Sequence, residues 1–213
     1  MHDLSSVLER LRVSRRHFTY WIGAAAGIAL LGGSHRIAFA YRRVRSFLIR
    51  SVEGTQRFDP ETWQLKVDGL VEKEKVLTYQ EILDLPTMSQ IKDFRCVEGW
   101  GLDNQKWEGF HLRIIFDRLR PKTDARYVTF YAMGGKYSDS LTIQEALEPE
   151  TMLAYKLNDK LLRPAQGRPL RLVVPRMYGY KSVKWVERMT LTEERHIGYW
   201  ERRGYPVDAS ISG

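Results

Sequence analysis

Apolar and polar side chains alternate in several short stretches of this chain, which is the pattern of a half-buried strand. In TWQLKVDGL the apolar positions are Trp63, Leu65 and Val67, and the Asp-Gly pair that follows favours a tight turn. The run LRLVVP, from 170 to 175, is apolar throughout and has the length of a buried strand. Further strands are predicted over 94–97, 127–132 and 182–191. Strands therefore dominate the body of the chain.

Short helices are predicted between these strands. Thr78 precedes Glu81 by three residues, which is the spacing of a capping box at a helix start. Thr142 and Glu145 repeat this spacing, and apolar residues over 112–119 recur at helical intervals. Because strands dominate and do not alternate with helices in a βαβ rhythm, we expect an α+β domain of mixed sheets.

The N-terminal segment carries an export pattern. Arg15 and Arg16 precede a mild apolar run from 18 to 33, and AFA at 38–40 offers a small-x-small cleavage site. With a serine before the pair and a phenylalanine two residues after it, the segment resembles a twin-arginine signal. The run is shorter than the roughly 20 strongly apolar residues that span a bilayer. We therefore expect residues 1–40 to be a twin-arginine-type export signal, with an uncleaved membrane anchor or an amphipathic surface helix as alternatives.

The rest of the chain is predicted to form a linker, residues 41–60, and one domain, residues 61–213. The last stretch, 198–213, is rich in aromatic residues and is expected to be a tail that packs them on the body. The twin-arginine route moves folded proteins, commonly with a cofactor already inserted. The domain is therefore expected to be exported folded to a periplasmic or other extracytoplasmic location.

The formal net charge of +8 lies mainly at the N-terminus. Residues 1–50 contain nine arginines and two acidic residues, whereas residues 51–213 contain 25 basic and 24 acidic ones. This balance argues against a nucleic-acid partner. Within the body, residues 156–188 contain nine basic residues and two acidic ones. That stretch is either a solvated basic face or a pocket for an anionic ligand.

Cys96 is the only cysteine, so the chain cannot form an internal disulfide. A free cysteine is often a small buried hydrophobe. As a nucleophile it would need a histidine base, and the body offers only His111 and His196. No H-x-x-x-H or C-x-x-C spacing is present, which argues against a zinc site made by protein ligands alone. The residues around the thiol decide between these alternatives.

Three stretches of the body resemble the sulfite oxidase family of molybdenum enzymes. They are FRCVEGW at 94–100, WEGFHL at 107–112 and GRPLRLVVPRMYGYKSVKWV at 167–186. The resemblance extends from about Thr62 to Trp200 and is strongest toward the branch of the periplasmic protein-methionine-sulfoxide reductase catalytic subunit. It implies a mixed-sheet molybdopterin-binding domain that holds a Mo-molybdopterin cofactor.

The resemblance also implies a set of site residues. The Cys96 thiolate would bind molybdenum, in keeping with the preference of soft metal sites for thiolate ligands. The remaining positions match cofactor contacts of the family, mainly with the pterin phosphate: Gln166, Arg171, Ser182, Val183 and Lys184. Arg95 would either help to hold the anion or form an ordinary salt bridge. Glu98 and Trp100 are expected to be structural.

The sequence departs from the family pattern at several positions. Gln166 replaces an asparagine ligand and is one methylene longer. Ala132 falls where the branch has a threonine that contacts the cofactor, so that contact is lost or moved. Tyr131 and Tyr137 are either near the metal or part of the core. The N-terminal asparagine and aromatic contacts of the family would fall near residues 45–50, where the match is poor.

The function implied is that of a molybdopterin oxidoreductase that transfers an oxygen atom in a two-electron reaction. The expected direction is reduction of a small or protein-bound S-oxide or N-oxide, with electrons from a membrane haem partner. No residues remain for the dimerisation domain of sulfite oxidases, so a monomer is expected. The alternatives are an exported cofactor- or ligand-binding module of the same fold without catalysis, and a thiol-dependent enzyme without metal.

Overall fold

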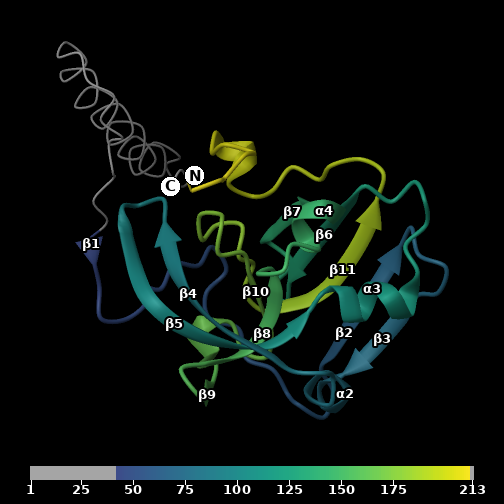
Figure 1. Cartoon of the computed structure of the whole chain (residues 1–213), viewed down its shortest axis with the longest axis horizontal. Coiled ribbons are helices and arrows are strands. Elements are labelled where there is room, and N and C mark those ends of the chain that lie inside the picture. Colours follow the sequence, from purple (N-terminus) through teal and green to yellow (C-terminus); the bar gives the residue numbers. More distant parts are fainter. Residues whose placement is uncertain (1–41, 212–213) are drawn as a thin grey trace, which may run out of the picture. The chain divides into compact units, whose positions relative to one another are not determined.

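Two β-sheets build the part of the chain that the computed structural model describes, residues 42–211 (Figure 1). Both sheets mix parallel and antiparallel pairs. The first sheet runs β1 (Arg42–Arg43), β5 (Trp100–His111), β8 (Met152–Leu157) and β10 (Arg171–Val173), with β4 (Met88–Cys96) paired to β5 and β9 (Lys160–Leu161) paired to β8. The second runs β3 (Lys75–Thr78), β2 (Gln64–Gly69), β11 (Val186–Thr192), β6 (Tyr127–Ala132) and β7 (Ser138–Thr142). The α+β class of mixed sheets is therefore confirmed.

The helices of this region are short and begin where the capping residues predict. Thr78 and Thr142 each accept a hydrogen bond from the backbone N–H three residues on, and the glutamate there bonds back to the cap. These capping boxes open α2 (Tyr79–Leu83) and α4 (Ile143–Ala146), while α3 (Arg113–Leu119) occupies the predicted stretch 112–119. Two 3-10 turns, η1 (Pro164–Gln166) and η2 (Glu201–Arg203), complete the set.

The predicted strands are present, but their ends differ. The buried strand predicted over 170–175 is β10, which covers only Arg171–Val173. β4 extends over Met88–Cys96 and is longer than the predicted 94–97. β11 begins at Val186 rather than at Ser182. Before it, Lys184 forms only an isolated bridge with Arg171, and Trp185 has a φ of 58°, which a strand does not allow. The prediction of a strand from 182 onward was therefore wrong for its first four residues.

The larger apolar core lies between the two sheets. Its side chains come from both, including the fully buried Leu65 and Phe130 of the second sheet and Phe110 and Leu153 of the first. Burying each such side chain contributes about 1.5–3 kcal/mol. A second cluster gathers Phe94, Trp100 and Trp107, among others, and Phe47 packs against it. The segment between β1 and β2 is thus attached to the domain.

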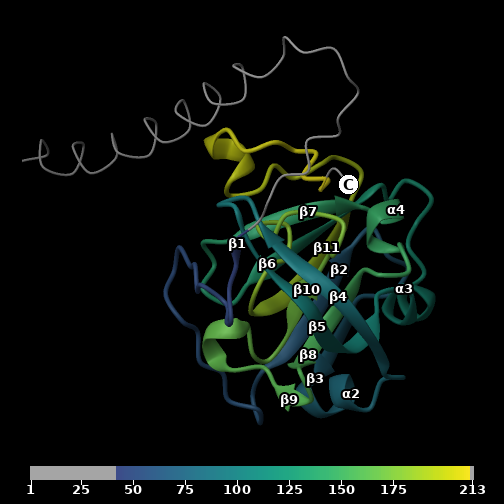
Figure 2. The same cartoon turned by 60° about the vertical axis from the view of Figure 1, so that its left-hand side comes forward.

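The C-terminal stretch folds back over the body, as predicted for an aromatic tail. The Tyr199 N–H donates to the Ser138 carbonyl at 3.0 Å, which places the tail beside the edge strand β7. Farther along, Tyr178 N–H donates to the Ala209 carbonyl at 3.0 Å. Figure 2 shows this stretch in yellow, passing over the loop that follows β10. The tail therefore holds the loop from 176 to 184 from outside.

The predicted export signal, residues 1–40, lies outside the described residues, so its assignment stays a prediction. Between residues 42 and 211, no helix combines the length and the apolar character that a membrane span requires.

Candidate active site

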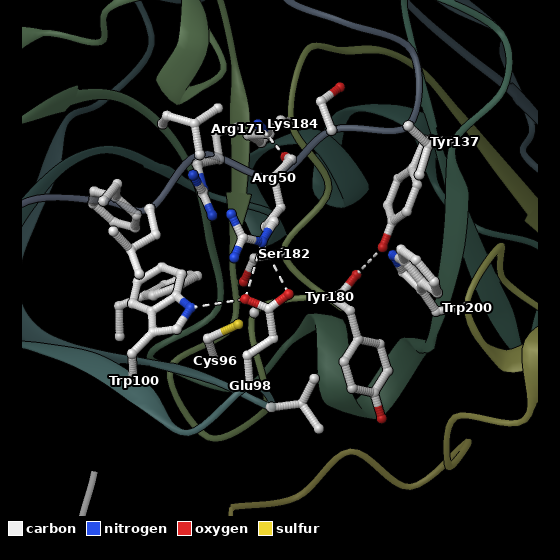
Figure 3. Close-up of a pocket in the computed structure, with 18 of the residues that line it drawn as sticks. Arg50, Cys96, Glu98, Trp100, Tyr137, Arg171, Tyr180, Ser182, Lys184 and Trp200 are labelled. Atoms are coloured by element: carbon white, nitrogen blue, oxygen red, sulfur yellow. Dashed lines mark hydrogen bonds and ion pairs between the residues drawn. The ribbon is translucent and has the colours of Figure 1, made fainter. Parts of the chain in front are cut away.

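Cys96 is the last residue of β4, and a tight hairpin presents it to a cavity. It stands opposite Trp100 in the ladder with β5, so only three residues form the loop. Gly99 closes the loop with a φ of +79°, a conformation that favours glycine, and its N–H donates to the Cys96 carbonyl at 3.0 Å. The thiol is half-buried at the cavity wall (Figure 3).

The cavity has a volume of about 330 Å³, which is within the range of small-molecule and cofactor sites. Segments far apart in the sequence build its wall: residues 47–53, the β4–β5 hairpin, β10, the loop before β11 and the C-terminal tail. Most of the wall is apolar or aromatic. The charged side chains on it are Arg50, Glu53, Glu98, Arg171 and Lys184.

Gly179 allows the loop after β10 to lie directly on β4. Its N–H donates to the Arg95 carbonyl at 2.8 Å, next to Cys96. A Cβ at this position would stand 2.3 Å from the Phe94 ring, so a larger residue would push the loop away. The YGYKSVK stretch thus brings its polar residues to the thiol end of the domain.

Arg171 is a buried cation with unused hydrogen-bonding capacity. It is 4% exposed, and its Nη1 donates to the Gln166 carbonyl at 3.1 Å. Its Nε is buried without any partner in residues 42–211. The guanidinium lies against the rings of Phe47, Phe94 and Trp107. Burial in this apolar setting lowers the pKa of Arg171 to about 10, a shift that an anion in the cavity would oppose.

Lys184 is a second cation in the same cavity. Its Nζ donates to the carbonyls of Arg50 and Ala165 at 2.8 and 3.2 Å, and it lies 4.2 Å from the centre of the Trp185 ring. Burial, followed by repulsion from Arg171, lowers the pKa of Lys184 to about 7. A buried and a partly buried cation that repel each other are costly unless an anion joins them.

The other predicted contacts divide into those on the cavity wall and those behind it. Ser182 lines the cavity, and its Oγ accepts from the Val174 N–H at 3.2 Å. Val183 is fully buried, and its N–H donates to the Lys181 carbonyl at 3.1 Å. Gln166 uses its Oε1 to accept from the Arg163 N–H at 2.9 Å. Of the described residues, Val183 and Gln166 are not on the wall, and Gln166 instead orients Arg171.

Burial raises the pKa of the Cys96 thiol to about 11, which makes it a weak nucleophile at neutral pH. Neither candidate histidine base is on the cavity wall of the described domain. His111 contacts the Glu148 carbonyl, and His196 contacts the Ser138 hydroxyl at 2.8 Å. Metal coordination, in contrast, removes the thiol proton outright. The setting therefore favours a metal ligand over a free nucleophile.

Arg95 is not among the described residues that line the cavity. It forms ion pairs with Asp93 at 2.6 Å and Asp103 at 2.8 Å, which agrees with the salt-bridge alternative. Across residues 42–211, no group of three or more histidine, cysteine, aspartate or glutamate side chains could hold a metal ion. Cys96 would therefore need non-protein donors to complete a metal site.

Two charged residues of the site were not predicted. Glu98 was expected to be structural, yet it lines the cavity beside Cys96. Arg50 crosses from the N-terminal segment, and its Nε donates to both carboxylate oxygens of Glu98 at 2.9 and 3.0 Å. Trp100 is buried and also lines the cavity, and its Nε1 donates to Glu98 at 3.2 Å. Glu98 could have been predicted to be near the site, because it lies two residues after Cys96. The residues around Arg50 contain no pattern that indicates its role.

Aromatic residues close the cavity from the tail side. Tyr137 lines it and donates from its hydroxyl to the Tyr180 carbonyl at 2.5 Å. Trp200 and Tyr205 of the tail are also on the wall, with their rings 5.1 Å apart. Tyr131 is not among the described wall residues. Tyr137 is thus the tyrosine, of the two considered, that reaches the site.

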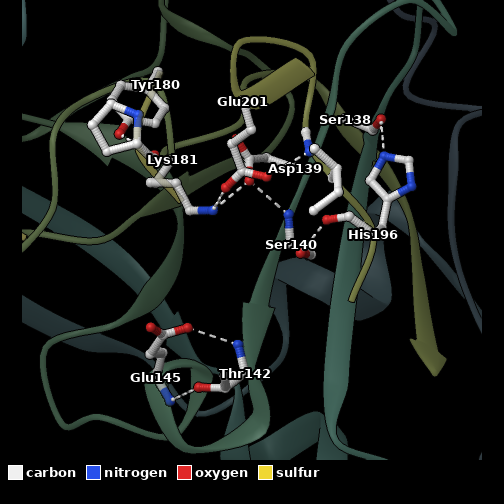
Figure 4. A network of polar contacts seen from close by, with 12 residues as sticks. Ser138, Asp139, Ser140, Thr142, Glu145, Tyr180, Lys181, His196 and Glu201 are labelled. Carbon is white, nitrogen blue, oxygen red and sulfur yellow. Dashed lines mark hydrogen bonds and ion pairs between the residues drawn. The ribbon is translucent and has the colours of Figure 1, made fainter. Parts of the chain in front are cut away.

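A buried ion triad supports the loop that carries Ser182 (Figure 4). Lys181 is 1% exposed and contacts both Asp139 of β7 and Glu201 of the tail, the latter at 2.8 Å. Burial raises the pKa of Asp139 to about 6, although Lys181 opposes the shift. The triad therefore joins β7, the loop and the tail next to the cavity.

One cavity of this mixed-sheet α+β domain is thus lined by a buried cation, a partly buried cation and a thiol. Residues 52–200 match the family model described as "Oxidoreductase molybdopterin binding domain", and the chain belongs to this family. The predicted membership of the sulfite oxidase family of oxidoreductases is confirmed.

Two curated proteins illustrate the relationship. The chain is 33% identical over 168 residues to the protein-methionine-sulfoxide reductase catalytic subunit MsrP of Campylobacter jejuni, covering 71% of this chain and 56% of that protein. It is 35% identical over 147 residues to the uncharacterized oxidoreductase YuiH of Bacillus subtilis, covering 69% and 74%. The chain thus spans little more than half the length of the MsrP relative.

Among solved structures, the sulfane dehydrogenase SoxCD from Paracoccus pantotrophus has a similar fold. The TM-score is 0.64 at 22% identity, over 69% of this chain and 42% of that chain. At this identity the likeness concerns the fold alone.

Proposed function

We propose that this chain is an exported, molybdopterin-dependent oxidoreductase that reduces an S-oxide or an N-oxide. One observation carries the proposal: the buried cation Arg171 and the partly buried cation Lys184 lie on the same cavity wall as Cys96, the only thiol. Membership of the molybdopterin-binding family supports it, as does similarity to a relative named for methionine-sulfoxide reduction.

The residues fit this cofactor chemically. A phosphate accepts hydrogen bonds from arginine and lysine, and the partnerless Nε of Arg171 is a donor that needs such an acceptor. Lys184 and the Ser182 hydroxyl lie on the same wall. Cys96 offers the soft sulfur ligand that suits molybdenum. Arg171, Lys184 and Ser182 would therefore hold the phosphate, and Cys96 would hold the metal.

The overall reaction balances with two electrons and two protons. The bond from sulfur or nitrogen to oxygen breaks, that atom gains two electrons, and the oxygen leaves as water after taking up two protons. When bound, the molybdenum cofactor supplies a centre that accepts the oxygen atom and passes on the electron pair. The protein supplies the position and the environment for this exchange.

The chain's own residues divide this work. Cys96, on its three-residue hairpin, would hold the metal at the end of β4. Tyr137, Trp200 and Tyr205 exclude water from one side of the cavity. The side chains of Arg50 and Glu98 remain 63% and 40% exposed, so the end near the thiol opens to solvent, from which protons can enter.

Electrons are proposed to come from a membrane haem protein, since an oxide reductase needs an outside source of two electrons. An extracytoplasmic location and export in the folded state complete the proposal, and a monomeric state stays a prediction.

The experiment compares turnover of cofactor-loaded wild type and Cys96→Ser with an artificial reductant and a small sulfoxide. A serine oxygen is harder than a thiolate sulfur, so we expect oxygen transfer to collapse while the phosphate contacts retain the pterin. Val97→Ala, next to the thiol on the cavity wall, is the matched control. Full activity of Cys96→Ser would show that the thiol is not the ligand. A loaded wild type without turnover on any oxide would instead indicate a binding module.

A further inference from the structure

The C-terminal tail, residues 196–211, forms one side of the cavity. Its Trp200 and Tyr205 are on the cavity wall. Hydrogen bonds hold the tail at both ends, to the edge strand β7 and to the loop after β10. Because the two aromatic side chains lie between these ends, the position of the middle of the tail sets how far the cavity is closed.

The buried ion triad holds the middle of the tail (Figure 4). Glu201, which follows Trp200 directly, contacts Lys181 at 2.8 Å, and Lys181 contacts Asp139 of β7. The three charged side chains are at most 1% exposed. Glu201 also accepts from the Gly198 N–H at 2.6 Å, which fixes the turn before Trp200. Of the described residues, none of these three charged ones is on the cavity wall, so they act on the cavity through the tail.

The triad contains one positive charge and two carboxylates. When all three groups are ionised, the site carries one uncompensated negative charge away from water, which is costly. Asp139 Oδ1 accepts from Lys181 and from the Ser140 N–H at 2.8 Å, whereas Oδ2 is buried without a partner in residues 42–211. A proton on Oδ2 removes the excess charge. Burial accordingly raises the pKa of Asp139 to about 6, although Lys181 opposes the shift.

The tail itself covers the carboxylate of Asp139. Gly198 packs against it so closely that a Cβ there would stand 2.6 Å from Oδ2. An ionised carboxylate is stabilised by hydration, and water reaches Oδ2 once this part of the tail moves away. Loss of the proton therefore favours a lifted tail. Trp200, two residues after Gly198, would move with it.

Beyond the triad, two tyrosines and a histidine face this part of the domain. Tyr137 and Tyr180 interact electrostatically with Asp139, and burial raises the pKa of both, so they stay neutral. His196 contacts the Ser138 hydroxyl at 2.8 Å, and burial lowers its pKa below the ordinary 6.5. His196 is therefore neutral at pH 7 but takes up a proton at lower pH, and it requires a control of its own.

We propose that Asp139 is a proton-controlled latch for the tail. With its proton, Asp139 leaves Lys181 and Glu201 as a balanced pair that holds the tail over the cavity. Without the proton, repulsion between the two carboxylates and the gain from hydration favour a lifted tail and an open cavity. Asp139 is thus a positioning residue, and the latch goes beyond the proposed function because it controls access to the cavity whatever reaction takes place there.

Hydrogen exchange of the tail amides, measured by mass spectrometry on the full-length chain, tests the latch. Rates are corrected for the intrinsic pH dependence of exchange, and the peptide 196–205 is compared with a core peptide from β6. A pKa of 3.8 in the lifted state and about 6 in the closed state predicts that the opening equilibrium of the tail rises roughly hundredfold between pH 4 and pH 7. The tail should also open more readily than β6. Identical opening of the two peptides at every pH would mean that the tail opens only by global unfolding, which would overturn the latch.

Two substitutions test the origin of this pH dependence. Asp139→Asn cannot ionise and should abolish it, while Glu201→Gln leaves one carboxylate facing Lys181 and should reduce it. His196→Gln is the matched control, because it keeps a polar partner for Ser138 and should retain the wild-type dependence. An undiminished dependence in either Asp139→Asn or Glu201→Gln would overturn the inference. So would its loss in His196→Gln, because the histidine would then be the group that titrates.

Release of the pterin tests whether the latch controls the cavity. Loaded wild type and loaded Asp139→Asn are dialysed at pH 5 and at pH 7, and the ratio of their release rates is measured. This ratio should rise about tenfold between the two pH values, because only the wild type loses the proton. An equal ratio at both pH values would show that the tail does not gate the cavity. The exchange measurement needs no cofactor, so a chain that loads no pterin would count against the proposed function alone.

Discussion

The guanidinium of Arg171 lies over the ring of Phe94, with 5.0 Å between the guanidinium carbon and the ring centroid. Phe94 precedes Cys96 by two residues on β4, so this contact joins the buried cation to the strand that carries the thiol. Aromatic faces attract a cation but do not neutralise it. A bound anion would therefore be needed to neutralise the buried charge of Arg171.

Arg171→Met should separate cofactor binding from folding. Loss of a charge-assisted bond of about 1.5–3 kcal/mol predicts roughly ten- to hundredfold weaker retention of the pterin. The cofactor-free variant should be as stable as the wild type or more so, because an apolar side chain of similar length replaces a buried charge. Pterin content after dialysis and thermal unfolding of the stripped proteins measure the two effects.

Arg176→Met provides the control for this variant. Arg176 lies in the loop after β10, but its side chain is 67% exposed and pairs with Glu148 at 3.3 Å, where little stability is at stake. It should retain the pterin as the wild type does. If Arg171→Met also retained it fully, Arg171 would have no place in the phosphate site.

Lys181→Met should destabilise the domain strongly. The substitution leaves Asp139 and Glu201 buried without their cation, for which a loss of about 3–5 kcal/mol is expected. Because Ser182 follows Lys181 directly, pterin retention should fall as well. Combining Lys181→Met with Asp139→Asn and Glu201→Gln should recover most of the stability. Urea unfolding at pH 7 tests this, and a single variant with an unchanged midpoint would contradict it.

The pKa of Asp139 predicts a pH dependence of stability. Burial raises this pKa from 3.8 to about 6, so between these values the folded state binds more protons than the unfolded state. The stabilisation from this proton is complete below about pH 4 and is lost as the pH rises through 6. Asp139→Asn should therefore gain stability relative to the wild type across this window and show a constant difference above it.

Urea unfolding at several pH values measures this difference, with the exposed Asp124→Asn as control. Lys181 and Glu201 face Asp139 and are present in both proteins, so the comparison isolates the change at Asp139. A difference between wild type and Asp139→Asn that stayed the same from pH 4 to pH 8 would show that Asp139 does not titrate in this range.

Replacement of Arg15 and Arg16 by lysine should stop export if these residues form the signal. Folded, cofactor-loaded protein would accumulate in the cytoplasm, because the body does not need the extension to balance its charge. It should turn over with an artificial reductant but fail to support reduction in the intact cell. Normal export of the double variant would instead favour an ordinary secretory signal or an anchor for residues 18–33.

Local interactions explain why parts of this fold can be predicted from the sequence. The capping boxes at Thr78 and Thr142 depend on residues three positions apart, and both form. The start of β11 was misplaced because the left-handed conformation of Trp185 is fixed by tertiary contacts, including the bond from its Nε1 to the Pro164 carbonyl at 2.6 Å. Alternation of side chains alone does not reveal such a turn.

In the candidate site, too, some residues could be predicted from the sequence and others depend on the fold. Cys96, Arg171, Ser182 and Lys184 were predicted from the resemblance to the sulfite oxidase family, and all line one cavity. Arg50 was not, because its pairing with Glu98 joins residues 48 positions apart and no local pattern marks it. The tail aromatics were predicted to pack on the body, but only the fold shows that they close the cavity.

Metal and pterin analysis tests the central claim most directly. The chain should be matured in a host that makes molybdopterin, purified, and analysed for molybdenum by mass spectrometry and for pterin by fluorescence after oxidation. With one thiol ligand on one cavity, we predict about one molybdenum and one molybdopterin per chain. Protein that is folded but contains neither, after maturation in such a host, would contradict the account.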